Sequence, residues 1–252
     1  MKTPLLELQD IHKIFGRNIV HQGISFDVFP GERVGLLGSS GTGKSVLLRS
    51  IIGLEYITKG KIYFNSQRID NLSEKELTKI RTKISYSFQS GALFDSMNVF
   101  ENLAFPLFEH TNDTLEEVEA RIDKMLQEVD LSHAKFLMPS DLSGGMQKRI
   151  GMARSMILSP EIILYDEPTA GLDPSNTVNV VELMKRFSSS GVTSIFVSHD
   201  IPAIQEFCDR VIILDKGRVV FDNDISAFNN SNDPIVRRFL IAEGFKHANQ
   251  TT

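Results

Sequence analysis

One glycine-rich segment constrains the fold of this chain more than any other feature: Gly38-Ser-Ser-Gly-Thr-Gly-Lys-Ser45 fits the pattern G-x-x-x-x-G-K-[ST] in full. An apolar run over residues 33–38 precedes it, and a helical pattern over residues 43–53 follows. A strand, a glycine turn and a helix start together form a nest of backbone N–H groups, which binds phosphate. The predicted phosphate-binding residues are Gly38, Ser39, Ser40, Gly41, Thr42, Gly43, Lys44 and Ser45.

The last two residues of this segment carry the chemistry. Lys44 supplies a positive charge for the β- and γ-phosphates of a nucleotide, and the hydroxyl of Ser45 suits Mg²⁺. A glycine turn with a purely structural role would explain the glycines but not a lysine and a serine at this register. We therefore expect a nucleotide bound with Mg²⁺.

Composition narrows the class of protein. The chain has 252 residues, of which 41% are hydrophobic and 23% charged, as is typical of a globular protein. Its formal net charge of -5 argues against a nucleic-acid partner. The single cysteine, Cys208, excludes an internal disulfide, and we expect it to be a small buried apolar side chain near a helix end. No apolar run is long enough to cross a bilayer, and we find no secretory signal.

Short strand patterns alternate with helical patterns, which predicts α/β architecture. The exception is the middle of the chain, where residues 99–158 show helical patterns and no convincing strand, including a capping box at Thr114 and Glu117. A helical insertion therefore interrupts a strand-rich core. The expected strands cover residues 5–11, 19–28, 33–38, 61–64, 84–88, 161–166, 193–198, 210–215 and 218–222.

Two adjacent carboxylates end the apolar run over residues 161–166. Asp166 suits the role of holding Mg²⁺, usually through water. Neighbouring side chains on an extended segment point in opposite directions, so Glu167 is placed to face an attacking water as a general base. Two solvated carboxylates at a strand end are common, and only the full phosphate loop makes this pair a strong signal.

A second glycine-rich helix start lies at Ser143, Gly144 and Gly145, directly before a helical pattern over residues 147–158. Its N–H groups and hydroxyl could meet an anion, which hints at a composite site shared between two copies. By itself, the segment is better explained by an ordinary serine N-cap with a flexible entry.

Together these segments resemble the nucleotide-binding subunit of an ATP-binding cassette (ABC) transporter. The motifs occur in the family's order: the phosphate loop, Gln89 after a strand, the signature Leu142–Met146, Glu167, Asp173, and His199 after an apolar strand. The resemblance implies an ATPase with a phosphate-loop NTPase fold, in which a RecA-like α/β core carries an antiparallel β subdomain and an inserted helical subdomain. One departure is Met146, where the family most often has glutamine.

The resemblance implies a single ABC ATPase domain over residues 1–252. Residues 1–89 and 160–228 would form the nucleotide-binding core, residues 90–159 the helical signature subdomain, and residues 229–252 a C-terminal helical extension and tail. Two cassettes, both copies of this chain, would form a head-to-tail homodimer. In it, the phosphate loop of one and Ser143, Gly144 and Gly145 of the other would enclose ATP.

The remaining family roles transfer to matching positions. Gln89 would ligate Mg²⁺ beside Ser45 and Asp166, act near the attacking water, and sense the membrane subunit. His199 would contact the γ-phosphate as a catalytic residue beside Glu167. Asp173 would cross the dimer interface, and Phe15 would stack beneath adenine; a core role for Phe15 remains the alternative.

The segment from Ser87 to Asn102 and the segment 233–240 resemble a narrower group, the ATPases of Mla-type lipid transporters that work with mammalian-cell-entry (MCE) domain proteins. That resemblance implies ATP-driven phospholipid transport, an integral membrane permease, an MCE-domain protein in the same complex, and a peripheral position on the cytoplasmic face of the membrane. We expect residues 91–100, with Phe94 and Met97, to dock on the permease; packing within the helical subdomain is the alternative.

Two other functions compete with this interpretation. One is a soluble ABC-type ATPase that acts on nucleic acid or ribosomes. The single cassette and the absence of a basic patch argue against it. The other is a nucleotide-binding module without turnover, which the presence of both Glu167 and His199 disfavours.

Overall fold

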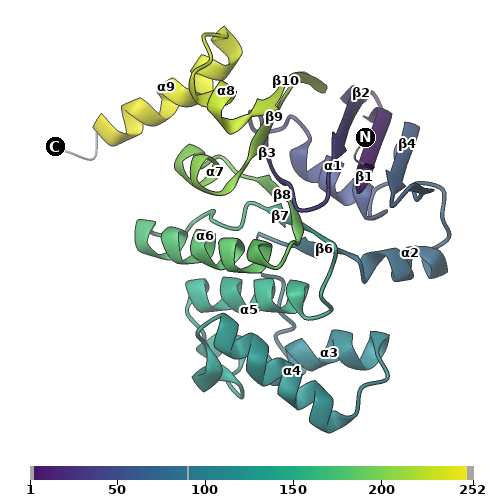
Figure 1. The fold of residues 1–252 in the computed structure, drawn as a ribbon, viewed down its shortest axis with the longest axis vertical. Coiled ribbons are helices and arrows are strands. Elements are labelled where there is room, and N and C mark those ends of the chain that lie inside the picture. The colour runs from purple at the N-terminus through teal and green to yellow at the C-terminus, as the bar shows by residue number, and fades with distance from the viewer. Residues whose placement is uncertain (1–2, 90, 249–252) are drawn as a thin grey trace. The chain divides into compact units, whose positions relative to one another are not determined.

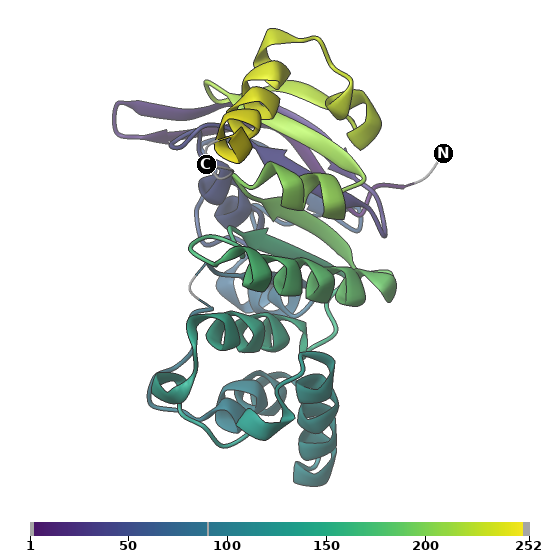
Figure 2. The same cartoon turned by 90° about the vertical axis from the view of Figure 1, so that its left-hand side faces the viewer.

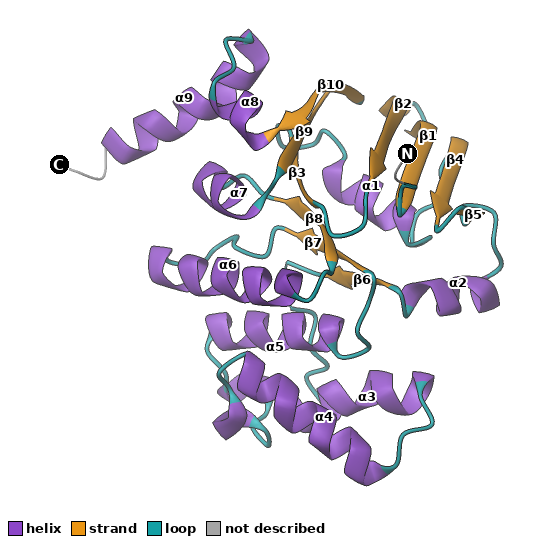
Figure 3. Cartoon of the chain, in the orientation of Figure 1, coloured by secondary structure: helices purple, strands orange, loops and turns teal. Residues whose placement is uncertain are grey.

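A computed structural model describes residues 3–89 and 91–248 of the chain, which form two compact units. The first unit comprises Met1–Ser73 and Ile195–Thr252, and the second comprises Glu74–Ser194. Figures 1 and 3 show the elements of each. No described helix has the length and apolarity that a membrane crossing requires.

An antiparallel sheet in the first unit has the strand order β2-β1-β4-β5. Its strands are β1 (Leu6–Phe15), β2 (Asn18–Val28), β4 (Lys59–Phe64) and β5 (Gln67–Arg68). Leu6, Leu8 and Ile11 of β1 are almost fully buried. Alternating burial along β1 and β2 is expected of strands that cover a core with one face.

The phosphate loop lies on a second set of strands in the first unit. β3 (Arg33–Leu37) pairs in parallel with β9 (Arg210–Asp215), and β9 pairs antiparallel with β10 (Arg218–Asp224). β8 (Thr193–Val197) is the other neighbour of β3, and the boundary between the units falls inside it. Residues 34–37 of β3 are all apolar and buried, as expected of a parallel strand that is covered on both faces. The helices of this unit are α1 (Lys44–Ile51), α7 (Ile201–Phe207), α8 (Ile225–Asn229) and α9 (Pro234–Ala248).

The second unit is mainly helical. Its strands β6 (Ile84–Ser87) and β7 (Ile162–Asp166) pair in parallel, and only helices occur among the described residues between them. α5 and α6 lie side by side (Figures 1 and 2). The helices are α2 (Glu74–Arg81), α3 (Val99–His110), α4 (Leu115–Glu128), the short 3₁₀ turns η1 (Ser132–Ala134) and η2 (Pro139–Asp141), α5 (Gly144–Met156) and α6 (Pro174–Ser189).

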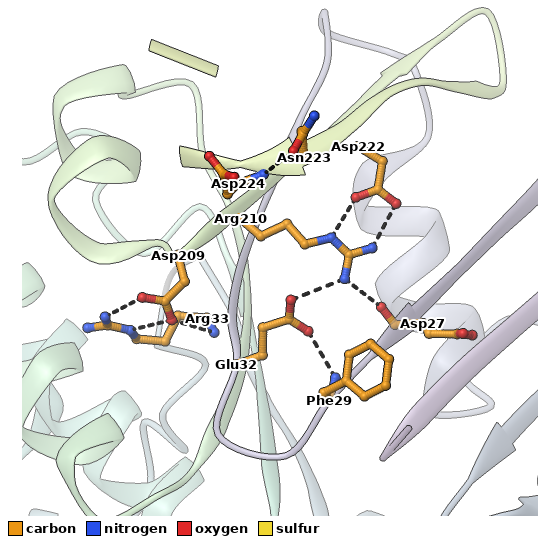
Figure 4. A network of polar contacts seen from close by, with 9 residues as sticks. All are labelled: Asp27, Phe29, Glu32, Arg33, Asp209, Arg210, Asp222, Asn223 and Asp224. Carbon is orange, nitrogen blue, oxygen red and sulfur yellow. Dashed lines mark hydrogen bonds and ion pairs between the residues drawn. The ribbon is translucent and has the colours of Figure 1, made fainter. Parts of the chain in front are cut away.

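A polar network in the first unit holds the turn that leads into β3 (Figure 4). Arg210 of β9 donates from Nε to Asp222 at 2.5 Å and from Nη1 to Glu32 at 3.1 Å and to the carbonyl oxygen of Asp27 at 2.9 Å. Glu32 in turn accepts a hydrogen bond from the backbone N–H of Phe29 at 2.9 Å. These partners raise the pKa of Arg210 further above its usual range, so the guanidinium stays charged. The turn before the strand that presents the phosphate loop is thus tied to β2, β9 and β10.

The fold class predicted from the sequence is confirmed. Every expected strand is present within a few residues of its predicted bounds, and the described residues over 99–158 contain no strand. The capping box of Thr114 and Glu117 is present, and Cys208 is buried at the end of α7. The predicted subdivision at residues 90, 159 and 228 stays a prediction; residue 90 and residues 249–252 lie outside the described residues.

Candidate nucleotide-binding site

The phosphate loop joins β3 to α1 and ends in an unusual helix start. Gly43 is the N-cap of α1, it has the left-handed conformation with φ 89°, and no side chain caps the helix. A Cβ atom on Gly43 would lie 2.6 Å from Nε2 of His21, and one on Gly38 would lie 2.6 Å from the carbonyl oxygen of Leu214. Both positions therefore require glycine for the fold of the chain itself.

Lys44 lies at the centre of the loop, with only 6% of its surface exposed. Its Nζ donates to the carbonyl oxygens of Gly38 at 2.7 Å and Ser39 at 3.3 Å. Nε2 of His199, between β8 and α7, lies 3.4 Å from the same nitrogen. The first unit therefore brings the two predicted phosphate-contacting side chains, Lys44 and His199, into direct contact.

The other loop residues form a tight turn around this lysine. Thr42 donates to the carbonyl oxygen of Ser39 from its hydroxyl at 2.9 Å and from its backbone N–H at 3.2 Å. Ser39, Ser40 and Gly41 are exposed at the tip of the turn, and Ser45 is half-buried in the first turn of α1. The exposed backbone of this turn is accessible to a phosphate group.

Phe15 ends β1 in the first unit, and 42% of its surface is exposed. Nζ of Lys13 lies 4.3 Å from the ring centre, within the range of a cation–π contact. That ammonium is fixed by Glu55 at 3.1 Å and by the carbonyl oxygen of Tyr56 at 2.6 Å. Phe15 is therefore a surface aromatic held by a buried lysine, which removes the alternative of a core role.

The acidic pair ends β7 in the second unit. Asp166 is 9% exposed and accepts a hydrogen bond from the hydroxyl of Tyr86 at 2.5 Å. Glu167 has φ 52°, a left-handed conformation that costs a residue other than glycine about 1–3 kcal/mol. Such strain is concentrated at functional sites, and here it lies at the start of a turn, in which the N–H of Ala170 donates to the carbonyl oxygen of Glu167 at 3.1 Å.

Two further predicted residues of the second unit lie at the ends of elements. Gln89 is exposed in the turn after β6. Asp173 is the N-cap of α6 and accepts hydrogen bonds from Ser175 and Asn176 of that helix. These hydrogen bonds lower the pKa of the Asp173 carboxyl well below its usual range. Asp173 thus has a structural role in its own chain, which the sequence analysis did not foresee.

The second glycine-rich helix start has a different geometry from the first. Ser143 is the N-cap of α5, and its Oγ accepts a hydrogen bond from the backbone N–H of Met146 at 3.3 Å. This is the serine cap considered above as the simpler explanation of the segment. A Cβ atom on Gly144 would meet nothing within 4 Å, whereas one on Gly145 would lie 2.9 Å from Oδ1 of Asn176.

Sequence reasoning missed a cleft in the second unit, with a volume of about 250 Å³. Phe88, Phe94 and Phe105 line it, together with His110 and Arg154. Its wall is organised by a buried side chain that no motif singled out, Asn102 of α3. The capping box of Asn98 and Glu101 predicts where that helix begins, and so indicates where this wall of the cleft lies.

Asn102 makes a dense set of hydrogen bonds. Oδ1 accepts from the backbone N–H of Phe94 at 2.9 Å and from Arg154 at 3.1 Å. Nδ2 donates to the carbonyl oxygens of Phe94 at 3.1 Å, Met97 at 2.9 Å and Asn98 at 3.1 Å. The loop after Gln89 is therefore fixed to α3, with Phe94 43% exposed at its surface.

The predicted site residues are divided between the two units. The first unit contains Phe15, Gly38, Ser39, Ser40, Gly41, Thr42, Gly43, Lys44, Ser45 and His199, and the second contains Gln89, Ser143, Gly144, Gly145, Asp166, Glu167 and Asp173.

Known proteins share these features. Residues 21–170 match the family described as ABC transporter. The chain is 38% identical over 243 residues to the intermembrane phospholipid transport system ATP-binding protein MlaF of Escherichia coli K12. The aligned region covers 95% of this chain and 90% of that protein. The chain is also 39% identical over 219 residues to the methionine import ATP-binding protein MetN of Carboxydothermus hydrogenoformans, covering 86% of this chain and 65% of that protein.

Among solved structures, the chain resembles the ATP-binding cassette MJ0796, determined as a dimer in a post-hydrolysis state bound to ADP and Pi. The TM-score is 0.80 at 31% sequence identity, covering 87% of this chain and 98% of that one. The phosphate loop, the acidic strand end and these similarities agree with one another. The chain belongs to the ATP-binding cassette family, and it is the ATPase subunit of an ABC transporter.

Proposed function

We propose that this ATPase drives phospholipid transport by a separate membrane permease, in an Mla-type system that includes an MCE-domain protein. ATP binds at the interface of a head-to-tail dimer of two copies of this chain. The subunit is peripheral, on the cytoplasmic face of the membrane.

The observation that carries the proposal is the similarity to MlaF over nearly the whole length of both proteins. Identity alone does not select the cargo, because the methionine import protein MetN is equally similar. The resemblance of residues 87–102 and 233–240 to the Mla-type ATPases favours phospholipid as the cargo.

The geometry supports a nucleotide role for each residue group. We assign the binding of adenine to Phe15, whose ring is exposed. We assign the binding of the β- and γ-phosphates to the phosphate loop with Lys44 and His199. We assign the role of general base to Glu167. Removal of a general base typically lowers the rate by about 10²–10⁴-fold.

Mg²⁺ fits the available donors. Ser45, Gln89 and Asp166 offer a hydroxyl, an amide and a carboxylate oxygen, and Mg²⁺ prefers oxygen ligands together with the phosphates of its nucleotide. No cluster of three His, Cys, Asp or Glu side chains that could enclose a metal occurs among the described residues. The donor set of Ser45, Gln89 and Asp166 suits a metal that also binds the phosphates of the nucleotide.

The dimer rests on the geometry of Gly144. Space next to its Cα is open, so nothing in its own chain requires glycine there. A glycine that the fold does not need suits the close approach of a group from outside the chain. In our proposal that group is the γ-phosphate of ATP bound to the other copy, which Ser143, Gly144 and Gly145 meet at the start of α5 while Asp173 lies at the same interface.

The cleft of the second unit is the proposed docking surface for the permease. Exposed phenylalanines at Phe88, Phe94 and Phe105 give it an apolar wall, and Phe94 packs edge-on against Phe105 with ring centres 5.4 Å apart. Exposed aromatic side chains around a cleft suit a short apolar helix of a partner. The neighbouring Gln89 then links contact with the permease to the nucleotide site.

Copurification tests the whole proposal. The chain is purified with its native complex from membranes in mild detergent, and bound proteins and lipids are identified by mass spectrometry. A polytopic permease, an MCE-domain protein and phospholipid are expected together. Recovery of ribosomes or RNA without a membrane protein would instead support a soluble ATPase acting on nucleic acid.

A matched pair of variants tests the docking surface. Phe94→Asp should weaken capture of the permease, whereas Phe136→Asp, at an exposed phenylalanine that does not line the cleft, should not. Both variants should bind ATP and melt normally as isolated chains. Normal permease capture by Phe94→Asp would place the docking surface elsewhere.

A further inference from the structure

A buried histidine contacts the phosphate loop from a strand that carries none of the motifs. His21 lies in β2 and has no exposed surface. Its Nε2 lies 3.0 Å from the carbonyl oxygen of Gly43, the N-cap of α1. A carbonyl oxygen can only accept, so Nε2 carries the hydrogen and donates it.

That hydrogen bond holds the peptide group at the end of the phosphate loop. The peptide between Gly43 and Lys44 is planar, and its C=O and N–H point in opposite directions. Anchoring the carbonyl of Gly43 therefore fixes the direction of the N–H of Lys44, the first residue of α1. The same carbonyl oxygen also accepts the first hydrogen bond of α1, from the N–H of Leu47 at 2.8 Å.

The surroundings of His21 hold the ring against the loop. On one side Gly43 leaves no room, since a Cβ there would lie 2.6 Å from Nε2. On the other side the turn between β9 and β10 approaches closely, with a Cβ on Gly217 placed 3.2 Å from the Cα of His21. The next residue, Gln22, donates its N–H to the carbonyl oxygen of Gly217 at 2.7 Å. The ring of His21 is thus held against Gly43, and its backbone against the turn at Gly217.

Packing alone does not account for a histidine here. Nδ1 of His21 is buried and has no hydrogen-bond partner among the described residues. An unsatisfied buried polar atom costs about 1–3 kcal/mol, a cost that a leucine of similar size would avoid. The hydrogen bond to Gly43 is the one contact of His21 that an apolar side chain could not supply.

We infer that His21 is a positioning residue for nucleotide binding: its Nε2–H orients the Gly43–Lys44 peptide so that the start of α1 presents its N–H groups to the β- and γ-phosphates. The inference rests on the proposed role of the phosphate loop. His21 itself does not touch the nucleotide.

Two amide variants separate the hydrogen bond from packing. Glutamine can place its side-chain N–H where Nε2 of histidine stands, whereas the shorter asparagine cannot reach the carbonyl of Gly43. His21→Leu removes the donor and keeps an apolar side chain. His12→Gln is the matched control, because His12 lies in neighbouring β1 and pairs with Asp10 at 2.9 Å instead of the loop.

The experiment measures the ATP dissociation constant and the melting temperature of each full-length variant, with hydrogen exchange of the peptide over residues 38–50. His21→Gln and His12→Gln should bind ATP within about twofold of wild type. His21→Asn and His21→Leu should bind about three- to tenfold more weakly, the usual worth of one hydrogen bond, with faster exchange confined to the loop.

Three results would overturn the inference. The first is wild-type ATP affinity in His21→Asn and His21→Leu. The second is equal weakening in all three variants at normal melting temperatures, which would show that the donor is irrelevant. If His21→Leu does not fold, the comparison between glutamine and asparagine decides alone. The third is normal ATP binding by Lys44→Ala, measured in parallel. That result would show that the phosphate loop is not the site, and the proposed function would fail with the inference.

Discussion

The two glycine-rich helix starts of this chain differ in how the helix is capped and in how closely the chain encloses the glycine. The first backbone N–H groups of any helix have no acceptor within that helix. At α1 no side chain caps the helix, and Gly43 is left-handed and tightly enclosed by its own chain. At α5 Ser143 supplies a side-chain cap, and the space beside Gly144 is open.

This difference separates two reasons for a glycine. At Gly43 the folded chain itself requires the absence of a side chain, so the loop is complete before any ligand arrives. At Gly144 the fold makes no such demand, which leaves a requirement from outside the chain as the explanation. In our proposal the first start is a binding site within one copy, and the second is a surface for the nucleotide of another copy.

The largest effect should come from Glu167→Gln, which separates nucleotide binding from chemistry. Glutamine keeps the shape and removes the base, so hydrolysis should fall by about 10²–10⁴-fold while ATP still binds. Without turnover the ATP-bound dimer should accumulate, and light scattering with ATP and Mg²⁺ should detect a larger species than for wild type. Turnover near the wild-type rate would show that Glu167 is not the base.

A pair of alanine substitutions tests the comparison directly. Gly43→Ala forces a left-handed alanine into contact with His21, so the free energy of unfolding should fall by about 2–4 kcal/mol. Gly144→Ala should leave stability unchanged or raise it by up to about 1 kcal/mol, because alanine is the better helix former.

Gly43→Ala and Gly144→Ala should also differ in their effect on function. Gly144→Ala should bind ATP normally as a monomer yet lose ATP-driven dimerisation, with turnover reduced by about 10²-fold through misplacement at the dimer site. Urea unfolding, ATP titration and steady-state hydrolysis provide the three measurements. Normal turnover of Gly144→Ala would remove the argument that an outside group needs this glycine.

Lys44→Ala tests the first start alone. The ammonium makes charge-assisted hydrogen bonds, which are worth about 1.5–3 kcal/mol, so ATP affinity should fall by about 10- to 100-fold. The fold should persist with a modest decrease in melting temperature, since Nζ also donates to the carbonyl oxygens of Gly38 and Ser39. Unchanged affinity in a titration would contradict the assignment of this loop to phosphate.

Local sequence signals predicted most of the fold because each of these elements depends on its own residues. Residues 34–37 of β3 and 162–165 of β7 are unbroken apolar runs, as expected of strands buried on both faces, and both strands lie where the sequence predicted them. The phosphate loop was likewise readable, since its glycines and Lys44 lie within eight consecutive positions. The two-residue strand β5 was missed because so short a run has no periodicity.

Long-range contacts explain what the sequence could not reveal. Tyr86 orients Asp166 from a position 80 residues earlier in the chain, and His21 holds Gly43 from 22 residues away. A tyrosine or histidine in a strand gives no sign of its partner until the fold brings the two together. Asn102 is similar, because its five hydrogen bonds depend on how the loop after Gln89 returns to α3.

The smallest effect concerns pH and again distinguishes the two helix starts, since α1 is supported by a titratable side chain and α5 by a serine. Burial lowers the pKa of His21 below the ordinary value of 6.5, and the charge of nearby Lys13 acts in the same direction. Below pH 6.5 the unfolded chain then binds a proton that the folded chain does not, so stability is complete above that pH and declines as the pH falls toward the folded-state pKa. The slope from one such group is at most about 1.4 kcal/mol per pH unit. Urea unfolding of wild type and His21→Gln between pH 7.5 and 5 should therefore show a steeper decline for wild type, because glutamine does not titrate; parallel curves would mean that His21 is protonated in the folded chain as readily as in the unfolded one.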